Sequence, residues 1–194
     1  MKTLKFVALV ACLLLIMSGG LFAQEDQGFK FTVLGGLDMF GEITLENDDI
    51  DFDEDVNVGL FLGAEGAMAL SETFYAGLGL RYHLPREVDA DTDIEFNFIP
   101  IYALFQLNFP MDGAIVPYIV GHIGYNFFIV DADDFAPDIE SEGGLYWGIG
   151  GGVYITENVS IQALYNVNYG ELSKDDITID VSYSKLTLAA AYTF

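Results

Sequence analysis

Apolar and polar residues alternate with a period of two through most of the chain beyond residue 28, and this pattern limits the fold more than any other feature. In residues 73–84, one set of alternate positions is apolar and the other carries glycine and polar groups. The apolar set is Phe74, Ala76, Leu78, Leu80, Tyr82 and Leu84, and the other set is Tyr75, Gly77, Gly79, Arg81 and His83. Because successive side chains of a β-strand point to opposite faces, this alternation predicts strands.

The same alternation recurs along the chain and divides it into eight predicted strands. They lie at about 28–44, 56–70, 73–86, 95–109, 117–130, 144–156, 158–170 and 179–194. No segment beyond residue 24 shows a convincing helical stripe. The sequence therefore predicts an all-β chain whose strands are long enough for the roughly 9–11 residues that a tilted membrane strand needs.

The connections between these strands alternate in kind. Acidic stretches follow the first, third, fifth and seventh strands, and hold 22 of the 30 Asp and Glu residues; they are 46–55, 87–95, 131–142 and 171–180. Short turns follow the other strands. Consecutive antiparallel strands place all four acidic stretches at one end, a pattern typical of bacterial outer-membrane barrels. We predict an eight-stranded antiparallel up-and-down transmembrane β-barrel.

The charge and hydropathy of the chain exclude two classes of protein. The formal net charge is −23, so nucleic acid is not an expected partner, because phosphate contacts need a basic surface. The chain is nevertheless 52% hydrophobic with a positive mean hydropathy. A disordered acidic protein would be poor in apolar residues, so the charge and the apolar residues must be segregated.

The N-terminus has the three parts of a secretory signal peptide. Lys2 and Lys5 precede an apolar run at 6–17, and Ala23 offers a small residue for cleavage. We predict a signal peptide at 1–23 and a barrel domain at 24–194, against the alternative of an uncleaved anchor. The single cysteine, Cys12, lies within the apolar run, so the mature chain is expected to contain no disulfide.

The last strand ends on an aromatic residue. In "LTLAAAYTF", Leu186, Leu188, Ala190, Tyr192 and Phe194 alternate with smaller or polar residues. This segment resembles the C-terminal assembly signal of outer-membrane proteins. With the signal peptide, "ALSETFYAGLGLRYHL" and "VPYIVGHIGYNF", the chain resembles the small eight-stranded outer-membrane family that includes OmpX, OmpW and the OmpA transmembrane domain. The resemblance implies that Tyr192 and Phe194 are recognised by the barrel assembly machinery.

The polar face of the strands distinguishes a membrane barrel from a soluble, lipocalin-like one. The apolar face is long and uncharged, and a polar lumen suits a membrane barrel better than a secreted one. We expect a polar lumen network of Lys30, Asp38, Glu65, Arg81, His122 and Lys185. Its charges should pair or trap water, because unpaired buried charge is costly. A structural plug is favoured over a conducting gate.

Aromatic residues of the opposite phase are expected to face lipid. We interpret them as an interfacial girdle. They are Tyr125, Phe127, Trp147, Tyr165, Tyr169 and Tyr192.

The acidic stretch "ENDDIDFDEDVN" at 46–57 admits two interpretations. It is not an EF-hand, because its sixth position from Asp49 is Glu54 in place of glycine and its twelfth is Leu60 in place of glutamate. If the lumen phase continues upward, the first two strands form a ribbon with one acidic face. Solvated charge is the favoured interpretation. The competing hypothesis is weak Ca²⁺ or Mg²⁺ binding by Asp49, Asp51, Asp53, Asp55, Asp89, Asp91 and Asp93.

These features predict a monomeric structural or interaction protein of a diderm outer membrane, without catalysis and without a cofactor other than a weakly bound cation. Its expected partners are membrane lipid, lipopolysaccharide and a basic extracellular molecule. The alternatives are a narrow cation-preferring channel or a hydrophobic-solute port, and a lipid A-modifying enzyme. For the enzyme, the deacylase pattern places Ser two residues after its His, where Gly124 follows His122. Mass spectrometry of lipid A distinguishes the enzyme.

Overall fold

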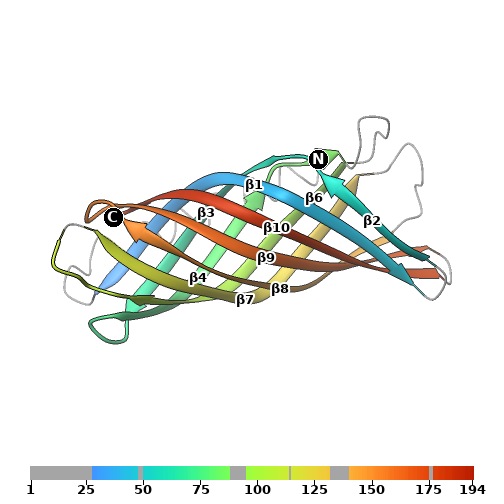
Figure 1. The fold of residues 1–194 in the computed structure, drawn as a ribbon. Coiled ribbons are helices and arrows are strands. Elements are labelled where there is room, and N and C mark those ends of the chain that lie inside the picture. Colours follow the sequence, from blue (N-terminus) through green and yellow to red (C-terminus); the bar gives the residue numbers. More distant parts are fainter. Residues whose placement is uncertain (1–27, 48–49, 88–94, 114, 132–139, 175–176) are drawn as a thin grey trace.

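The chain forms a closed antiparallel β-barrel whose strands are inclined to the long axis (Figure 1). It is seen in a computed structural model that describes residues 28–47, 50–87, 95–113, 115–131, 140–174 and 177–194. Across these residues there is no helix long and apolar enough to cross a lipid bilayer.

Ten strand segments build eight positions in the barrel wall. The segments are β1 (Phe29–Asn47), β2 (Ile50–Val56), β3 (Gly59–Ala69), β4 (Phe74–His83), β5 (Arg86–Glu87), β6 (Glu95–Asn108), β7 (Val116–Asp131), β8 (Glu140–Tyr154), β9 (Val159–Lys174) and β10 (Ile177–Thr193). β2 and β3 both pair with β1, and β4 and β5 both pair with β6, so each of these two couples occupies one position. Pairing of β1 with β10 closes the barrel. The predicted fold and strand count are confirmed.

The two phases of each strand separate into a buried and an exposed set, as β9 illustrates. Ser160, Gln162 and Asn166 are at most 8% exposed, whereas Ile161 and Tyr165 are 48% and 46% exposed. The polar phase is therefore inside and the apolar phase outside, as in a membrane barrel and opposite to a soluble one. β10 follows the same rule down to Phe194, which is 69% exposed.

A bulge in β1 reverses its phase and corrects one prediction. Between Met39 and Glu42, β1 advances one residue more than its partner β10. Asp38 below the bulge is buried, but above it Glu42 is exposed and Ile43 is buried. The prediction that the lumen phase continues into the acidic ribbon is therefore wrong. The carboxylate of Glu42 faces outward, and the apolar side chain of Ile43 faces in.

Glycines on the lumen side make room for aromatic rings. A Cβ on Gly79 would lie 2.5 Å from the ring of Tyr102, and a Cβ on Gly41 would lie 2.6 Å from the hydroxyl of Tyr183. Two large rings can therefore lie flat across the narrow interior of an eight-stranded barrel.

Candidate functional site in the lumen and at the rim

A carboxylate on β1 organises one half of the polar lumen. Asp38 lies with one oxygen, Oδ2, 2.6 Å from Nδ1 of His83 and 3.7 Å from Nζ of Lys185. Its other oxygen, Oδ1, accepts a 2.6 Å hydrogen bond from the hydroxyl of Thr187. All four side chains are at most 3% exposed. The negative charge thus lies directly beside a buried ammonium group, as the cost of burying charge requires.

A second carboxylate, Glu65 on β3, organises the other half. Its Oε1 accepts a 2.7 Å hydrogen bond from the hydroxyl of Tyr102 and lies 3.5 Å from Nη2 of Arg81. Tyr102 in turn accepts a 3.0 Å hydrogen bond from Nε of Arg81. The ring of His122 stacks on Tyr102 with centroids 4.3 Å apart, and its Nε2 lies 3.9 Å from Glu65.

Two further side chains join these halves into one lumen network. The hydroxyl of Tyr146 donates to Oδ1 of Asn166 at 2.8 Å, and Nδ2 of Asn166 donates to Thr187 at 2.7 Å. Because the Tyr146 proton is directed to Asn166, Nδ1 of His122, 3.3 Å away, must be the donor to the Tyr146 oxygen. The chain of contacts therefore runs from Asp38 to Glu65 across the barrel.

The structure brings five of the six predicted lumen residues into this network and places the sixth elsewhere. Lys30 lies nearer the turn end, where its Nζ is 4.1 Å from the centroid of the Tyr75 ring and 5.2 Å from that of Tyr154. Such stacking on aromatic faces stabilises a cation. The sequence reasoning did not assign His83, Tyr102, Tyr146, Asn166 and Thr187 to the network, although His83 and Asn166 belong to the polar phase that it identified.

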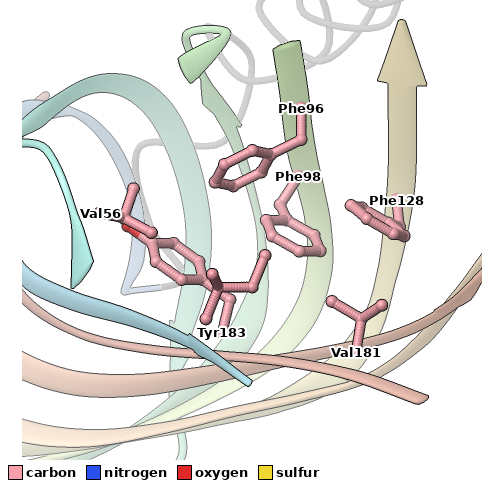
Figure 2. Packing of buried hydrophobic residues seen from close by; sticks show 7 residues of the cluster. Val56, Phe96, Phe98, Phe128, Val181 and Tyr183 are labelled. Atoms are coloured by element: carbon pink, nitrogen blue, oxygen red, sulfur yellow. The ribbon is translucent and has the colours of Figure 1, made fainter. Parts of the chain in front are cut away.

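An aromatic plug fills the lumen on the side of the acidic connections. It comprises Ile43, Val56, Phe96, Phe98, Phe128, Val181 and Tyr183, whose side chains converge inside the wall (Figure 2). Phe98 is central, because its ring stacks on those of Phe128 and Tyr183 with centroids 4.7 and 5.6 Å apart.

The order of inward residues along β10 places the plug directly above the lumen network. Tyr183 of the plug is followed by Lys185 and Thr187 of the network, and Nζ of Lys185 lies 4.5 Å from the centroid of the Tyr183 ring. The inside of the barrel is thus filled by two successive layers, one apolar and one ion-paired.

On the outer surface, acidic residues of four strands form a continuous row. Glu142 is opposite Glu171, Glu171 is opposite Asp180, and Asp180 is opposite Glu46. All four side chains are exposed. The backbone of Asp51 continues the register beyond Glu46. We call Glu142, Glu171, Asp180 and Glu46 the acidic row. Directly opposed like charges destabilise a sheet, so water, salt or a cationic group must screen them.

Most of the predicted cation ligands lie outside the described residues, namely Asp49, Asp89, Asp91 and Asp93. Asp53 is described and accepts a 2.7 Å hydrogen bond from the hydroxyl of Thr44. Asp55 is exposed opposite Glu42. Within the part of the chain that the structure describes, no cluster of three or more His, Cys, Asp and Glu is arranged to hold a metal ion.

Neutralising two members of the acidic row should stabilise the barrel at low salt. We expect the double variant E171Q/D180N to raise the free energy of unfolding by about 1 kcal/mol, because each directly opposed pair costs a few tenths. The gain should shrink in 0.5 M NaCl, where the screening length is a few ångströms. Thermal unfolding at both salt concentrations measures it.

Millimolar Ca²⁺ at constant ionic strength is the informative addition, and N166D, which adds a carboxylate in the lumen, is not a suitable control. The matched control is E157Q, an exposed acid in the turn between β8 and β9. If Ca²⁺ stabilises wild type no more than NaCl does, the row is only a solvated face.

The comparisons with known proteins agree with this architecture. A family model for the outer membrane protein beta-barrel domain matches residues 9–194. The chain belongs to this family. This outer-membrane barrel is similar in fold to Neisserial surface protein A, with 16% identity over 86% of this chain and 97% of that one, and a TM-score of 0.54. It is also similar to OprG from Pseudomonas aeruginosa, with 14% identity over 87% and 97% and a TM-score of 0.50.

A third similar structure is that of the outer membrane protein AlkL in lipid bilayers, with 13% identity over 89% and 92% of the two chains and a TM-score of 0.54. Identities this low show the shared fold alone. No match was found among curated protein sequences. The barrel is accordingly a bacterial outer-membrane protein, and its particular role must be argued from its own residues.

Proposed function

We propose that this protein is a closed outer-membrane barrel with a structural or interactive role at the cell surface. The observation that carries the proposal is the filled lumen, in which the aromatic plug lies on the lumen network. Eight strands leave an interior that side chains can fill, and here aromatic rings and paired charges occupy it. The acidic row lies on the outer surface at the end of the acidic connections, where a basic extracellular partner or a cation would meet it.

The position of both histidines argues against a lipid A-modifying enzyme. His122 and His83 are 4% and 3% exposed and lie in the lumen, paired with Tyr146 and Asp38. A base acting on lipid would have to lie at the outer wall, within hydrogen-bond reach of the lipid. The non-catalytic assignment therefore rests on where these side chains point.

Export and partners follow from the same proposal. The segment 1–23 would be removed after Ala23, and the mature barrel would be a monomer surrounded by membrane lipid and lipopolysaccharide. The barrel assembly machinery would be its partner only during biogenesis. Nucleic acid would not bind, because a chain with a net charge of −23 repels phosphate.

The purified barrel should not conduct ions when it is inserted into planar lipid bilayers. The Phe98 ring and its stacking partners block the lumen on one side, and the paired charges of Asp38 and Lys185 block it below. Single-channel recording over a range of voltages is the measurement. Discrete cation-selective steps from wild-type protein would support the channel alternative and refute the closed barrel.

The control for this recording opens the plug without touching the charges. A variant with Phe98→Ala and Phe128→Ala removes two stacked rings. If it also fails to conduct, the lumen network alone closes the barrel. If it conducts while wild type does not, the plug is the decisive layer.

A further inference from the structure

Phe40 has a strained backbone at an exposed position. Its φ is 50°, the only positive φ at a non-glycine residue among those described, and its side chain is 82% exposed. It lies in the β1 bulge, where a residue in the left-handed region is usually glycine. The neighbouring residue is Gly41, so a glycine stands one position away from where the backbone would favour it.

The lumen side of the bulge has no room for this ring. Gly41 lies against the ring of Tyr183, whose hydroxyl would be 2.6 Å from a Cβ at that position. Tyr183 belongs to the aromatic plug and is 1% exposed. The bulge therefore turns Phe40 to the outside while the next position stays free for Tyr183. Nothing in the packing of the lumen accounts for an aromatic residue at position 40.

The surroundings of Phe40 mark a boundary on the outer wall. Towards the turns lie exposed apolar residues, with Leu37 at 40% and Leu60 at 54%, which are cross-strand partners. Towards the acidic connections lie Glu42 and Asp55, also cross-strand partners and both exposed. Phe40 thus stands where the lipid-facing band of the barrel meets its acidic outer surface. Aromatic side chains are favoured at this level of a membrane, because it is apolar on one side and wet on the other.

We infer that Phe40 is an anchor that inserts into the interfacial region of the outer leaflet, and that this lipid contact offsets the backbone strain of the bulge. The partner is the lipid surface itself, because the side chain continues the lipid-facing band of an outer-membrane barrel. The strain and the anchor are properties of one residue, so substitutions can separate them. Phe40 is absent from the aromatic girdle that the sequence predicted, since simple alternation assigns it to the lumen.

Position 40 can be located with a fluorescent side chain. In a Trp147→Phe background, F40W gives a barrel whose only tryptophan is at the bulge. In vesicles of phosphatidylcholine brominated on the acyl chain, its emission should be blue-shifted, and bromine near the headgroup should quench it more than bromine near the chain end. F52W in the same background is the control, because Phe52 lies on β2 beyond the bulge, and it should escape quenching. An unquenched, water-like emission from position 40 would overturn the inference.

Stability in vesicles separates the anchor from the strain. F40A keeps the strained backbone without the ring, and F40G removes both. The equilibrium constant for unfolding should rise in the order wild type, F40G, F40A, and the two variants should differ by roughly five- to thirtyfold, as a left-handed conformation costs a non-glycine residue. Equilibrium urea unfolding in lipid vesicles measures it. If F40G is more stable than wild type, the lipid contact does not offset the strain and the inference fails.

Discussion

Replacement of Asp38 by asparagine should lower the free energy of unfolding by about 3 kcal/mol, which is the range for breaking a buried ion pair by removing one partner. Asparagine keeps the shape of the side chain but not its charge. The ammonium group of Lys185, 3.7 Å from Oδ2, and the imidazole of His83, 2.6 Å away, would then lose the anion between them. The measurement is equilibrium urea unfolding in lipid vesicles, followed by the fluorescence of Trp147.

A double-mutant cycle shows whether the pairing causes this loss. K185M alone should also be costly, because it leaves the carboxylate beside a single histidine. The double variant D38N/K185M should cost clearly less than the sum of the two single losses, since neither charge then remains buried alone. D112N, in the exposed turn between β6 and β7, is the matched control and should change stability little. Strictly additive losses would contradict the pairing.

Deletion of Phe194 should abolish most assembly of the barrel into the outer membrane. The terminal aromatic is 69% exposed, and its ring lies edge-on to that of Tyr192 with centroids 4.9 Å apart. It is also tied to β1 by a 2.8 Å hydrogen bond from its amide to the carbonyl of Phe31. Figure 1 places this end of the chain away from the connection between β9 and β10. The amount of heat-modifiable protein in outer-membrane fractions is the readout.

Two controls separate recognition from folding. Phe194→Tyr should assemble normally, because it keeps an aromatic ring at the end of the alternating strand. The deletion variant should refold from urea into vesicles in vitro, because it loses one exposed ring and one hydrogen bond at the edge of the wall. Normal cellular yield of the deletion would show that Phe194 is not part of an assembly signal.

The fold was predictable from the sequence because a two-sided strand writes its environment into alternate residues. The polar phase of β9 and the even run of Leu186 to Phe194 on β10 are enough to give strands, their inner face and their order. The bulge at Phe40 was not predictable in this way, because it depends on one extra residue and on the ring of Tyr183 across the seam. That single residue reversed the faces of every side chain above it on β1.

The lumen network was predictable for its charges and not for its tyrosines. Asp38, Glu65, Arg81 and Lys185 interrupt otherwise uncharged strands and so stand out. Tyr102 on β6 lies between isoleucine and alanine in a segment that is apolar on both faces, so its phase carries no signal. Phe96 and Phe98 of the plug share that segment. A signal did exist in Gly79, the cross-strand neighbour of Tyr102, since a missing side chain leaves space for a large ring.

The most direct test of the whole account is cysteine labelling on intact cells. Single cysteines at 51, 91, 134 and 175 lie in the four acidic connections, and those at 72, 112 and 157 lie in the turns. With a membrane-impermeant maleimide, the first four should be labelled from outside, and the last three should be labelled only after the cells are opened. Acidic connections that react from both sides of the membrane would contradict an eight-stranded barrel that presents its acidic end at the cell surface.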